Sequence, residues 1–450
     1  MFTHLHFIGI CGISMSSLAI ISAGLGYTVS GSDSTEGQIP QKLINAGITV
    51  YRGNSPENLP HNVEKTRVAV IYSAAIGESN IELSAAREAG FRTLGRAEFL
   101  AMLTKDFPSR IGVAGMHGKS TVCAMLAEIF KAANADPDVL CGAEAKALDG
   151  TFRIGAGNHL IYEACEYKDS FLHTSPTIAV ITNIEPEHLD YFRGIEAIRA
   201  SFLKYVRSAE GCIINIDSPE ARMIANLIPE KAITCSIQSN KADFYAVSPE
   251  IYRGIGSFKL FWRGIFLCDI NLRVPGRHNI SNALIAAATA IEAGISPQAV
   301  EQGLSLFSGV RRRMEYRGEL NGAVIYDDYA HHPTEIRATL AAAREMGFRF
   351  ISCAFQPHTY SRTAAFFCDF ANAFGDADEV IFADIYAARE ENVYGITSRD
   401  LATVTKKGYY LPTPDLIAAH FKNIAAPDVM LLTMGAGELN RVPELLFSNK

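Results

Sequence analysis

A run of small residues around one lysine is the segment whose residue types most clearly suggest chemistry. Gly115-Met116-His117-Gly118-Lys119-Ser120-Thr121 lies between a predicted strand, Ile111–Ala114, and a predicted helix, Val122–Ala132. Backbone N–H groups in such a turn can surround a phosphate at the helix N-terminus. Lys119 would reach the terminal phosphates of a nucleotide, and the Ser120 hydroxyl would contact Mg²⁺. The strict pattern has glycine where this chain has Val113, so a glycine-rich turn with a surface lysine is the alternative.

Carboxylate and imidazole side chains follow two later predicted strands. Glu163 ends the strand 160–163 in the sequence Glu-Ala-Cys-Glu, and His188 lies in the segment 183–190 that follows the strand 178–182. The carboxyl ends of parallel strands face the ligand crevice of an α/β sheet. A carboxylate and an imidazole beside a phosphate loop could hold a divalent metal. Taken singly, each residue is equally well explained as a loop cap or a solvated group.

A second glycine turn lies near the N-terminus, between a predicted strand, Leu5–Ile10, and a predicted helix, Ser14–Leu25. The dinucleotide fingerprint G-x-G-x-x-G falls on Gly9, Cys11 and Ser14, with an extra Gly12. Cys11 and Ser14 are small enough for the backbone to approach a diphosphate. The turn therefore leaves open NAD or FAD, another nucleotide, or no ligand.

Three more segments carry groups that could contact substrates. The run Arg311-Arg312-Arg313 could be a solvated face, or one guanidinium could clamp a phosphate. The consecutive pair His331-His332 cannot easily face one metal, which argues against a two-His zinc site. Arg362, which follows the predicted strand 350–355, is a candidate partner for a carboxylate.

The elements that must position these groups alternate between strand and helix three times along the chain. This alternation predicts an α/β fold with three domains and mainly parallel sheets. A Phe/Tyr/Val-rich stretch over 241–275, broken by glycines, predicts an antiparallel excursion, and residues 108–110 resemble a linker. At roughly 100–200 residues per domain, the 450-residue length agrees with about three domains.

Composition excludes several classes of protein. The chain has 41 Lys+Arg and 48 Asp+Glu, a net charge of −7, and 48% apolar residues, which excludes disorder and gives no general reason to bind nucleic acid. No apolar stretch approaches the ~18–20 residues of a membrane span, and no signal peptide is recognisable. Nine cysteines without a CxxC motif predict reduced thiols rather than disulfides or a zinc ribbon. We expect a cytoplasmic protein, and its oligomeric state, monomer or homodimer, stays open.

The motifs together resemble those of the Mur ligase family, which builds the peptidoglycan stem peptide with ATP. Residues 115–121 resemble the family's G-T-[HN]-G-K-[ST]-T loop, and the segments 183–190, 275–282 and 327–333 resemble further family motifs in the same order. The resemblance runs from residue 5 to residue 441. It is greatest to the branch that joins L-alanine to UDP-N-acetylmuramate, on segments 7–15, 163–172, 327–336 and 355–363.

The resemblance implies an amide ligase with three domains and with ATP and Mg²⁺ as cofactors. These would be a Rossmann-like UDP-sugar domain (1–107), a central P-loop-type ATPase domain (108–309) and a Rossmann-like C-terminal domain (310–450) for the amino acid. Arg313 and Asp328 would complete the nucleotide site on domain closure. ATP binding is implied for Gly115, His117, Gly118, Lys119, Ser120, Thr121, Asn279, Arg313 and Asp328.

The resemblance also implies the remaining sites. Metal ligands would be Ser120, Glu163 and His188, and catalytic roles would fall to Lys119, His188, Glu163 and His331. The amino acid would contact His331, His358 and Arg362. The UDP-sugar would contact Gly9, Cys11, Gly12, Ser32, Asp33 and Ser73.

The chain departs from the family pattern at several positions. Cys165 and Lys168 replace two carboxylates of the E-A-D-E-S-D motif, Thr359 replaces a common arginine, and Ser201 stands where some members have a carbamylated lysine. The alanine-adding branch also lacks that lysine. Two rival interpretations remain: a ligase that recycles an intact tripeptide, suggested by Cys11, and a catalytically silent nucleotide-binding scaffold.

Overall fold

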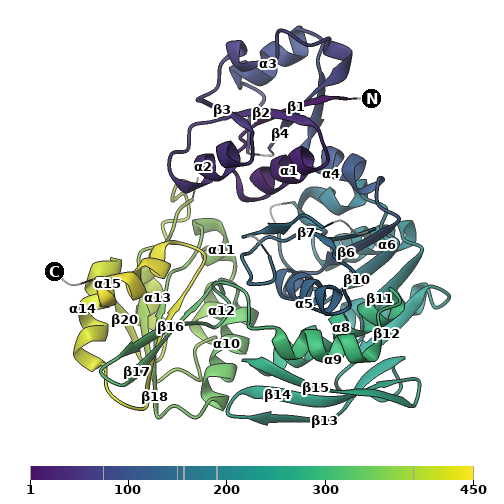
Figure 1. Ribbon diagram of the computed structural model, residues 1–450. Helices are drawn as coiled ribbons and strands as arrows, with labels where there is room; N and C mark the ends of the chain where they lie inside the picture. Colours follow the sequence, from purple (N-terminus) through teal and green to yellow (C-terminus); the bar gives the residue numbers. More distant parts are fainter. Residues whose placement is uncertain are drawn as a thin grey trace. The chain divides into compact units, whose positions relative to one another are not determined.

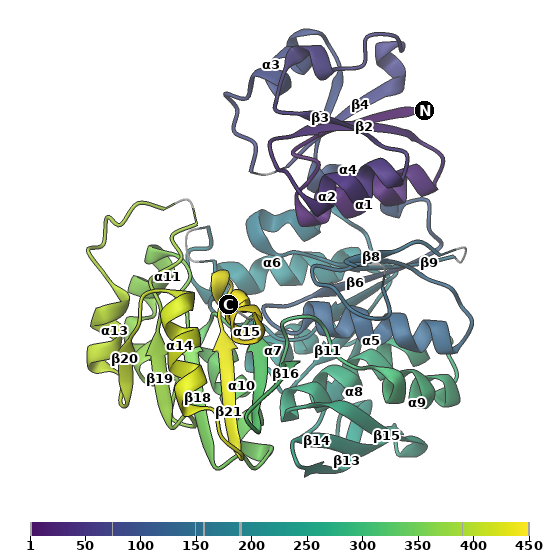
Figure 2. The same cartoon turned by 60° about the vertical axis from the view of Figure 1, so that its left-hand side comes forward.

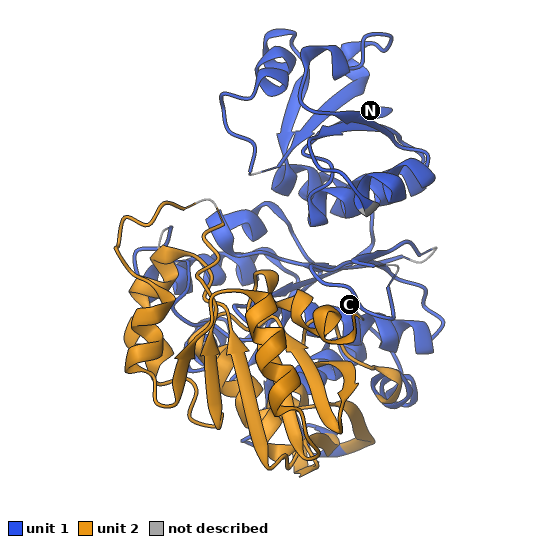
Figure 3. Cartoon of the chain, turned by 90° about the vertical axis from the view of Figure 1, so that its left-hand side faces the viewer, with its two compact units in different colours: residues 1–245, 261–265, 282–304 blue, residues 246–260, 266–281, 305–450 orange. Residues whose placement is uncertain are grey.

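The computed structural model describes residues 2–73, 75–148, 150–155, 158–188, 191–388 and 390–448 (Figure 1). Its internal contacts divide the chain into two compact units, coloured separately in Figure 3. Unit 1 comprises residues 1–245, 261–265 and 282–304, and unit 2 comprises residues 246–260, 266–281 and 305–450.

The N-terminal part of unit 1 is a five-stranded sheet in the order β3-β2-β1-β4-β5, with every pair parallel. Because the strand order reverses between β1 and β4, a ligand crevice is expected at their carboxyl ends. The strands are β1 (His4–Ile8), β2 (Thr28–Asp33), β3 (Thr49–Arg52), β4 (Val68–Tyr72) and β5 (Arg92–Gly95), and the helices are α1 (Ile13–Gly24), α2 (Gln38–Asn45), α3 (Ile81–Glu88) and α4 (Arg96–Thr104).

The second sheet has the order β15-β14-β13-β12-β11-β10-β6-β9-β7-β8. Its pairs from β13 to β7 are parallel, and β8 is antiparallel to β7. Its strands are β6 (Ser109–Ala114), β7 (Asp138–Leu140), β8 (Phe152–Arg153), β9 (His159–Glu163), β10 (Ile178–Ile181), β11 (Gly211–Asn215), β12 (Ala232–Ser236), β13 (Phe244–Tyr252), β14 (Ile255–Trp262) and β15 (Ile265–Pro275). The associated helices are α5 (Lys119–Ala132), α6 (Ile195–Ser208), α7 (Pro219–Leu227), α8 (Arg277–Glu292) and α9 (Pro297–Leu306).

Two-residue turns connect the last three strands of this sheet. Arg253 and Gly254 join β13 to β14, Arg263 and Gly264 join β14 to β15, and all four have positive φ. Positive φ at both central residues defines the type I′ turn of a β-hairpin, so these strands run antiparallel. The predicted antiparallel excursion over 241–275 is thus confirmed.

The third sheet lies in unit 2 in the order β16-β17-β21-β18-β19-β20, parallel except for the β16–β17 pair. Its strands are β16 (Glu315–Leu320), β17 (Ala323–Asp328), β18 (Phe350–Phe355), β19 (Glu379–Phe382), β20 (Gly408–Tyr410) and β21 (Val429–Met434). Its helices are α10 (Pro333–Glu345), α11 (Tyr360–Ala365), α12 (Phe367–Ala371), α13 (Ser398–Val404), α14 (Pro414–Ile424) and α15 (Val442–Phe447).

Helices cover both faces of this third sheet (Figure 2). Ile351 and Leu432 pack with Leu340 of α10 in one apolar cluster. Leu431, the next residue of β21, packs with Phe421 of α14 in the other cluster. Successive strand residues point to opposite faces, so this alternation gives the two-sided core of a doubly wound α/β domain.

The predicted α/β class with mainly parallel sheets is confirmed. The helix predicted from Val122 begins three residues earlier, at Lys119, and strand β6 takes up two residues of the predicted linker. The domain boundaries at 107/108 and 309/310 stay a prediction. All nine cysteines are free thiols; seven are buried, as expected, whereas Cys165 is partly buried and Cys368 is exposed. Among the described residues, no helix combines the length and the apolar character that crossing a bilayer requires.

Candidate active site

The phosphate-loop motif forms the turn between β6 and α5. Gly115 has φ +136°, and a Cβ there would lie 2.0 Å from Thr182 Oγ1. Gly118 has φ +86°, and a Cβ there would lie 2.6 Å from Asn282 Oδ1 on α8. Both positions require glycine, because of the left-handed backbone and because neighbouring side chains approach closely. Asn282 ends the segment 275–282 singled out from the sequence, but it was not predicted to be a site residue.

Residues at the carboxyl end of β10 hold this loop in place. The side-chain oxygen of Asn183 accepts a hydrogen bond from the His117 N–H at 2.9 Å, and its amide donates to the His117 carbonyl at 2.8 Å. Thr182 Oγ1 donates to the same carbonyl at 2.6 Å. The backbone around His117 is therefore fixed from two directions. Leu189 and Asp190, at the end of the motif that begins at Asn183, lie outside the described residues.

The ammonium group of Lys119 donates hydrogen bonds to its own loop and to a carboxylate. It donates to the carbonyls of Gly115 and Met116 and to both carboxylate oxygens of Glu166, at 3.1 and 3.0 Å. Burial acts to lower the pKa of Lys119, but Glu166, Cys165 and Glu163 together outweigh it, and the pKa is raised. Lys119 is therefore a fixed cation at the N-terminus of α5.

Glu166 is the carboxylate that connects the lysine with the histidine of the next motif. Its side chain is 2% exposed, and Oε1 lies 3.3 Å from His188 Nε2. Burial acts to raise the pKa of Glu166, but the charge of Lys119 and the contact with His188 lower it, so the group is ionised. His188 has φ +53° and packs its ring on Tyr167.

Glu163, the carboxylate selected from the sequence, has different partners from Glu166. It accepts hydrogen bonds from the Gly142 N–H and, at 3.4 Å, from Cys141 Sγ. Cys141 Sγ also lies 3.6 Å from the carbonyl oxygen of Ser120. Glu163 therefore stays close to Ser120, whereas Glu166 contacts His188. The predicted metal set of Ser120, Glu163 and His188 stays a prediction, to which the geometry adds Glu166.

Glu166 belongs to the motif read from the sequence, but no sequence signal favoured it over Glu163. Glu166 directly precedes an irregular turn, η3 (Tyr167–His173), in which Lys168 and Asp169 have positive φ. Asp169 accepts hydrogen bonds from Tyr191 Oη, at 2.8 Å, and from Ser201 Oγ. Ser201 is thus bound to a carboxylate of the same turn.

The residues predicted to bind a UDP-sugar gather at the carboxyl ends of β1, β2 and β4. The Cys11 N–H donates to Asp33 Oδ2 at 2.9 Å, and the Gly9 N–H donates to the Ser32 carbonyl at 2.8 Å. A Cβ on Gly9 would lie 3.4 Å from Cβ of Ser73, and Gly12 precedes α1. Ser32 is fully buried, and its hydroxyl donates a hydrogen bond to Glu82 at 2.7 Å. This contact is structural, and the contact of Ser32 with the UDP-sugar stays a prediction.

In unit 2, the segment around Arg313 lies against the end of β17. Arg313 Nη1 is 3.2 Å from Glu335 Oε1, and both flanking residues, Arg312 and Met314, have positive φ. The carboxylate of Asp328 accepts from the N–H groups of Met314 and Ala330, each at 2.7 Å. Burial raises the pKa of Asp328 to about 6, against the opposing charge of Arg313.

The three residues predicted to bind the amino acid lie close to one another. The His331 and His358 ring centroids are 6.0 Å apart, and an Arg362 guanidinium nitrogen lies 3.2 Å from His358 Nδ1. Burial, with the nearby His331 and Arg362, lowers the pKa of His358 to about 4, so its ring is neutral at physiological pH. A neutral ring can accept the hydrogen bond that Arg362 donates.

Asn279 of α8, which was predicted to contact the nucleotide, donates to the Pro275 carbonyl at 2.7 Å.

Three family models match consecutive parts of the chain. They are described as "Mur ligase family, catalytic domain" (residues 4–108), "Mur ligase middle domain" (113–290) and "Mur ligase, glutamate ligase domain" (312–437). The chain belongs to the Mur ligase family, with its three-domain α/β architecture.

Similar proteins cover the full length of the chain. The UDP-N-acetylmuramate–L-alanine ligase of Agathobacter rectalis is 44% identical over 98% of this chain and 97% of its own length. The protein of the same name from Acetivibrio thermocellus is 40% identical over 100% of this chain and 96% of its own length. The crystal structure of the UDP-N-acetylmuramate-alanine ligase MurC from Thermotoga maritima superposes with a TM-score of 0.82 at 25% identity, covering 98% of each chain.

Proposed function

We propose that this chain joins L-alanine to UDP-N-acetylmuramate with ATP, in the synthesis of peptidoglycan precursors. The single observation that carries the proposal is the phosphate loop, in which Lys119 begins α5 beside Glu166 and His188. Full-length identity of about 40% to proteins named for this activity supports the choice of substrates.

The reaction needs an activated acid, because a carboxylate is a poor electrophile. A lactyl carboxylate oxygen of the muramate attacks the γ-phosphorus of ATP, and ADP leaves. The resulting acyl phosphate is attacked at its carbonyl carbon by the amine of alanine. An amide bond forms, phosphate leaves, and the amine gives up a proton.

The role of Lys119 follows from its geometry. Its charge and three donors, together with the N–H groups of the loop, would stabilise the anionic γ-phosphoryl group as it transfers. Asn183 and Thr182 would keep the loop in the conformation that presents these donors.

The donor groups around the loop fit a divalent cation. Glu166 is an ionised, buried carboxylate within 3.3 Å of His188 Nε2, and carboxylate and hydroxyl oxygens suit Mg²⁺. Glu166, His188 and Ser120, with Glu163 nearby, would hold the ion, which would offset phosphate charge.

For the amino acid, we propose that Arg362 pairs with the carboxylate of alanine and that His331 or His358 orients the amine. The forked guanidinium suits a carboxylate, and once Arg362 turns from His358 Nδ1 to that carboxylate, the neutral His358 ring could accept a hydrogen bond from the ammonium group. The assignment of UDP-sugar contacts to Gly9, Cys11, Gly12 and Asp33 rests on their position at the β1–β2 edge.

The test is incubation of the purified chain with ATP, MgCl₂, UDP-N-acetylmuramate and either L-alanine or the stem tripeptide. We expect phosphate release and a product of the alanyl adduct's mass with L-alanine. Lys119→Met should reduce turnover by at least about 100-fold, because it removes the cation at the transferring group. Lys131→Met, near the other end of α5, is the matched control and should keep wild-type turnover.

Two outcomes would contradict the proposal. Phosphate release with the tripeptide but not with L-alanine would identify a recycling ligase. Tight binding of the UDP-sugar without ATP turnover for any amino acid would identify a scaffold.

A further inference from the structure

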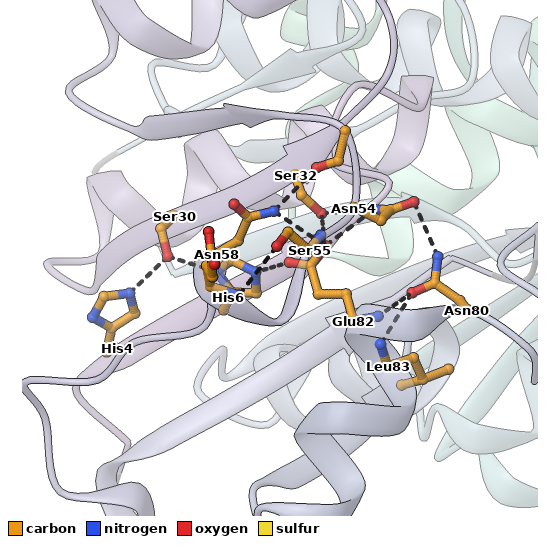
Figure 4. A network of polar contacts seen from close by, with 12 residues as sticks. His4, His6, Ser30, Ser32, Asn54, Ser55, Asn58, Asn80, Glu82 and Leu83 are labelled. Atoms are coloured by element: carbon orange, nitrogen blue, oxygen red, sulfur yellow. Dashed lines mark hydrogen bonds and ion pairs between the residues drawn. The ribbon is translucent and has the colours of Figure 1, made fainter.

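A fully buried carboxylate lies at the centre of a polar network in the N-terminal sheet (Figure 4). Glu82, the second residue of α3, is 0% exposed. Its Oε1 lies 2.7 Å from Nε2 of His6, a residue of β1 that is also fully buried. Its Oε2 accepts a hydrogen bond from the Ser32 hydroxyl of β2 at 2.7 Å. One carboxylate thus joins α3 to two neighbouring strands.

The same Oε2 atom also faces the segment that follows β3. The Asn54 amide donates to it at 3.1 Å, the Ser55 N–H at 3.2 Å and the Asn58 amide at 3.4 Å. Burial acts to raise the pKa of Glu82, but the hydrogen bonds from His6, Ser32 and Asn54 lower it. The carboxylate is therefore a buried charge that converging donors satisfy.

A second set of contacts closes the network. Asn80 Nδ2 donates to Asn54 Oδ1 at 3.0 Å, and Asn80 Oδ1 caps α3 by accepting from the N–H groups of Glu82 and Leu83. The segment 53–58 is thereby tied to the start of α3 as well as to Glu82 itself.

The network ends at the backbone of the glycine turn. The carbonyl of Ser32, whose hydroxyl binds Glu82, accepts from the N–H groups of Gly9 and Ile10 at 2.8 and 3.1 Å. This turn and the segment after β3 lie at the carboxyl edge of the sheet, where a nucleotide sits in a doubly wound fold.

Stability alone does not explain a charge at this place. Desolvating a carboxylate is costly, and well-packed apolar residues of similar volume often give equal or greater stability. The carboxylate adds directional contacts, since its two oxygens hold donors from β1, β2 and the segment 53–58 in one arrangement.

We propose that Glu82 is a positioning residue for the nucleotide sugar, holding the segment 53–58 and the Gly9 turn in the conformation that binds the UDP moiety. The inference rests on the proposed function, because it takes UDP-N-acetylmuramate as the ligand of this sheet.

The test compares Glu82→Ala with Glu82→Gln in the full chain. Gln keeps one oxygen for the donors of Ser32 and Asn54, and its amide can donate to His6 in the other ring tautomer. By calorimetric titration, Ala should raise the Kd for UDP-N-acetylmuramate at least about tenfold, because the ligand must then order the segment, and Gln should stay within about threefold. The KM values for ATP and L-alanine should be unchanged in both variants.

Asp243→Ala is the matched control, because Asp243 accepts hydrogen bonds from Thr234 and Arg263 on the ten-stranded sheet. It should lower the Tm without changing the Kd. If Glu82→Ala fails to fold, Asn54→Ala removes the hydrogen bond that the segment 53–58 donates to Glu82 through its Asn54 amide. This variant should also raise the Kd.

A wild-type Kd in Glu82→Ala or in Asn54→Ala would overturn the inference and leave the proposed function intact. A Gln variant as weak as Ala would also overturn it, since the charge and not the hydrogen-bond geometry would then matter. Wild-type protein that does not bind UDP-N-acetylmuramate would refute the proposed function and this inference with it.

Discussion

Glu166 shows how much of a site depends on which way one side chain points. Glu163 and Glu166 are three residues apart, yet Glu163 faces the Gly142 N–H and Glu166 faces Lys119 and His188. The cation and the carboxylate neutralise each other in a buried place, where leaving either one alone would cost several kcal/mol. The residue types therefore indicate that a carboxylate lies in the site, and the geometry of the turn decides which of the two carboxylates contacts Lys119 and His188.

Asp328 gives a prediction about pH, because its carboxyl is buried and its pKa is raised from 3.8 to about 6. Between these values the folded protein holds the proton more tightly than the unfolded chain, so this group's contribution to stability falls as pH rises. Asp328→Asn removes the titration. The substitution should cost about 2 kcal/mol more at pH 4 than at pH 7, measured by denaturant unfolding at both pH values.

Asp378 provides a control of opposite sign. Burial acts to raise its pKa, but the hydrogen bonds from Arg344 and the Ile351 N–H, together with the charges of Arg344 and Lys407, lower it. Its stabilising contribution is present above the usual carboxyl pKa and is lost as pH falls, so Asp378→Asn should cost more at pH 7 than at pH 4. If Asp328→Asn costs the same free energy of unfolding at both pH values, the pKa of Asp328 is not raised in the folded protein.

At the scale of elements, the β6–α5 turn is the most constrained connection near the candidate site. Three groups from the carboxyl end of β10 and one from α8 approach its backbone, and two of its residues have a left-handed conformation. The helix begins at Lys119 because Gly118 can adopt φ +86°.

Gly115→Ala should therefore reduce ATP turnover by at least about 100-fold, since the new Cβ would displace Thr182 and shift the loop by a fraction of an ångström or more. Phosphate release at saturating substrate concentrations measures the effect. Gly26→Ala is the matched control, because Gly26 also has positive φ but a Cβ there would contact nothing within 4 Å. Its cost should be about 1 kcal/mol of stability with normal turnover, and equal turnover of the two variants would refute the steric argument.

Element positions were largely predictable from the sequence. The strand predicted at 350–355 has the bounds of β18, and the strand predicted at 160–163 lies within β9, because each is an apolar run that ends at polar or turn residues. Side-chain directions within irregular turns were not predictable, since Lys168, Asp169 and His188 adopt positive φ against their intrinsic preference. The buried contact of Ser32 with Glu82 likewise depends on residues 50 positions apart.

At the scale of the whole molecule, the apolar clusters differ in whether one part of the chain or two parts contribute their residues. Both apolar clusters of the third sheet consist of residues within 314–446. The N-terminal sheet has a cluster of its own on one face, but on the other its α1 and α4 residues join a cluster that also contains Leu140 and Phe171 of the central part.

The segment 310–450 expressed alone should therefore unfold cooperatively in urea, because both of these clusters lie entirely within it. The segment 1–107 alone should have a lower midpoint, because it would expose the apolar faces of α1 and α4. Circular dichroism of the two fragments and of the full chain provides the comparison. A fragment 1–107 as stable as 310–450 would show that the shared cluster contributes little.

The contact between Lys119 and Glu166 also affects the binding of ions at this place, because an incoming ion must replace one partner of the pair. A phosphate that takes over the ammonium group leaves a buried carboxylate uncompensated, and a cation that takes over the carboxylate leaves the ammonium group uncompensated. Each half-occupied state carries the cost of an unpaired buried charge, whereas the arrival of both ions restores neutrality. Anion and cation binding are therefore thermodynamically linked, with each raising the affinity for the other by the same factor.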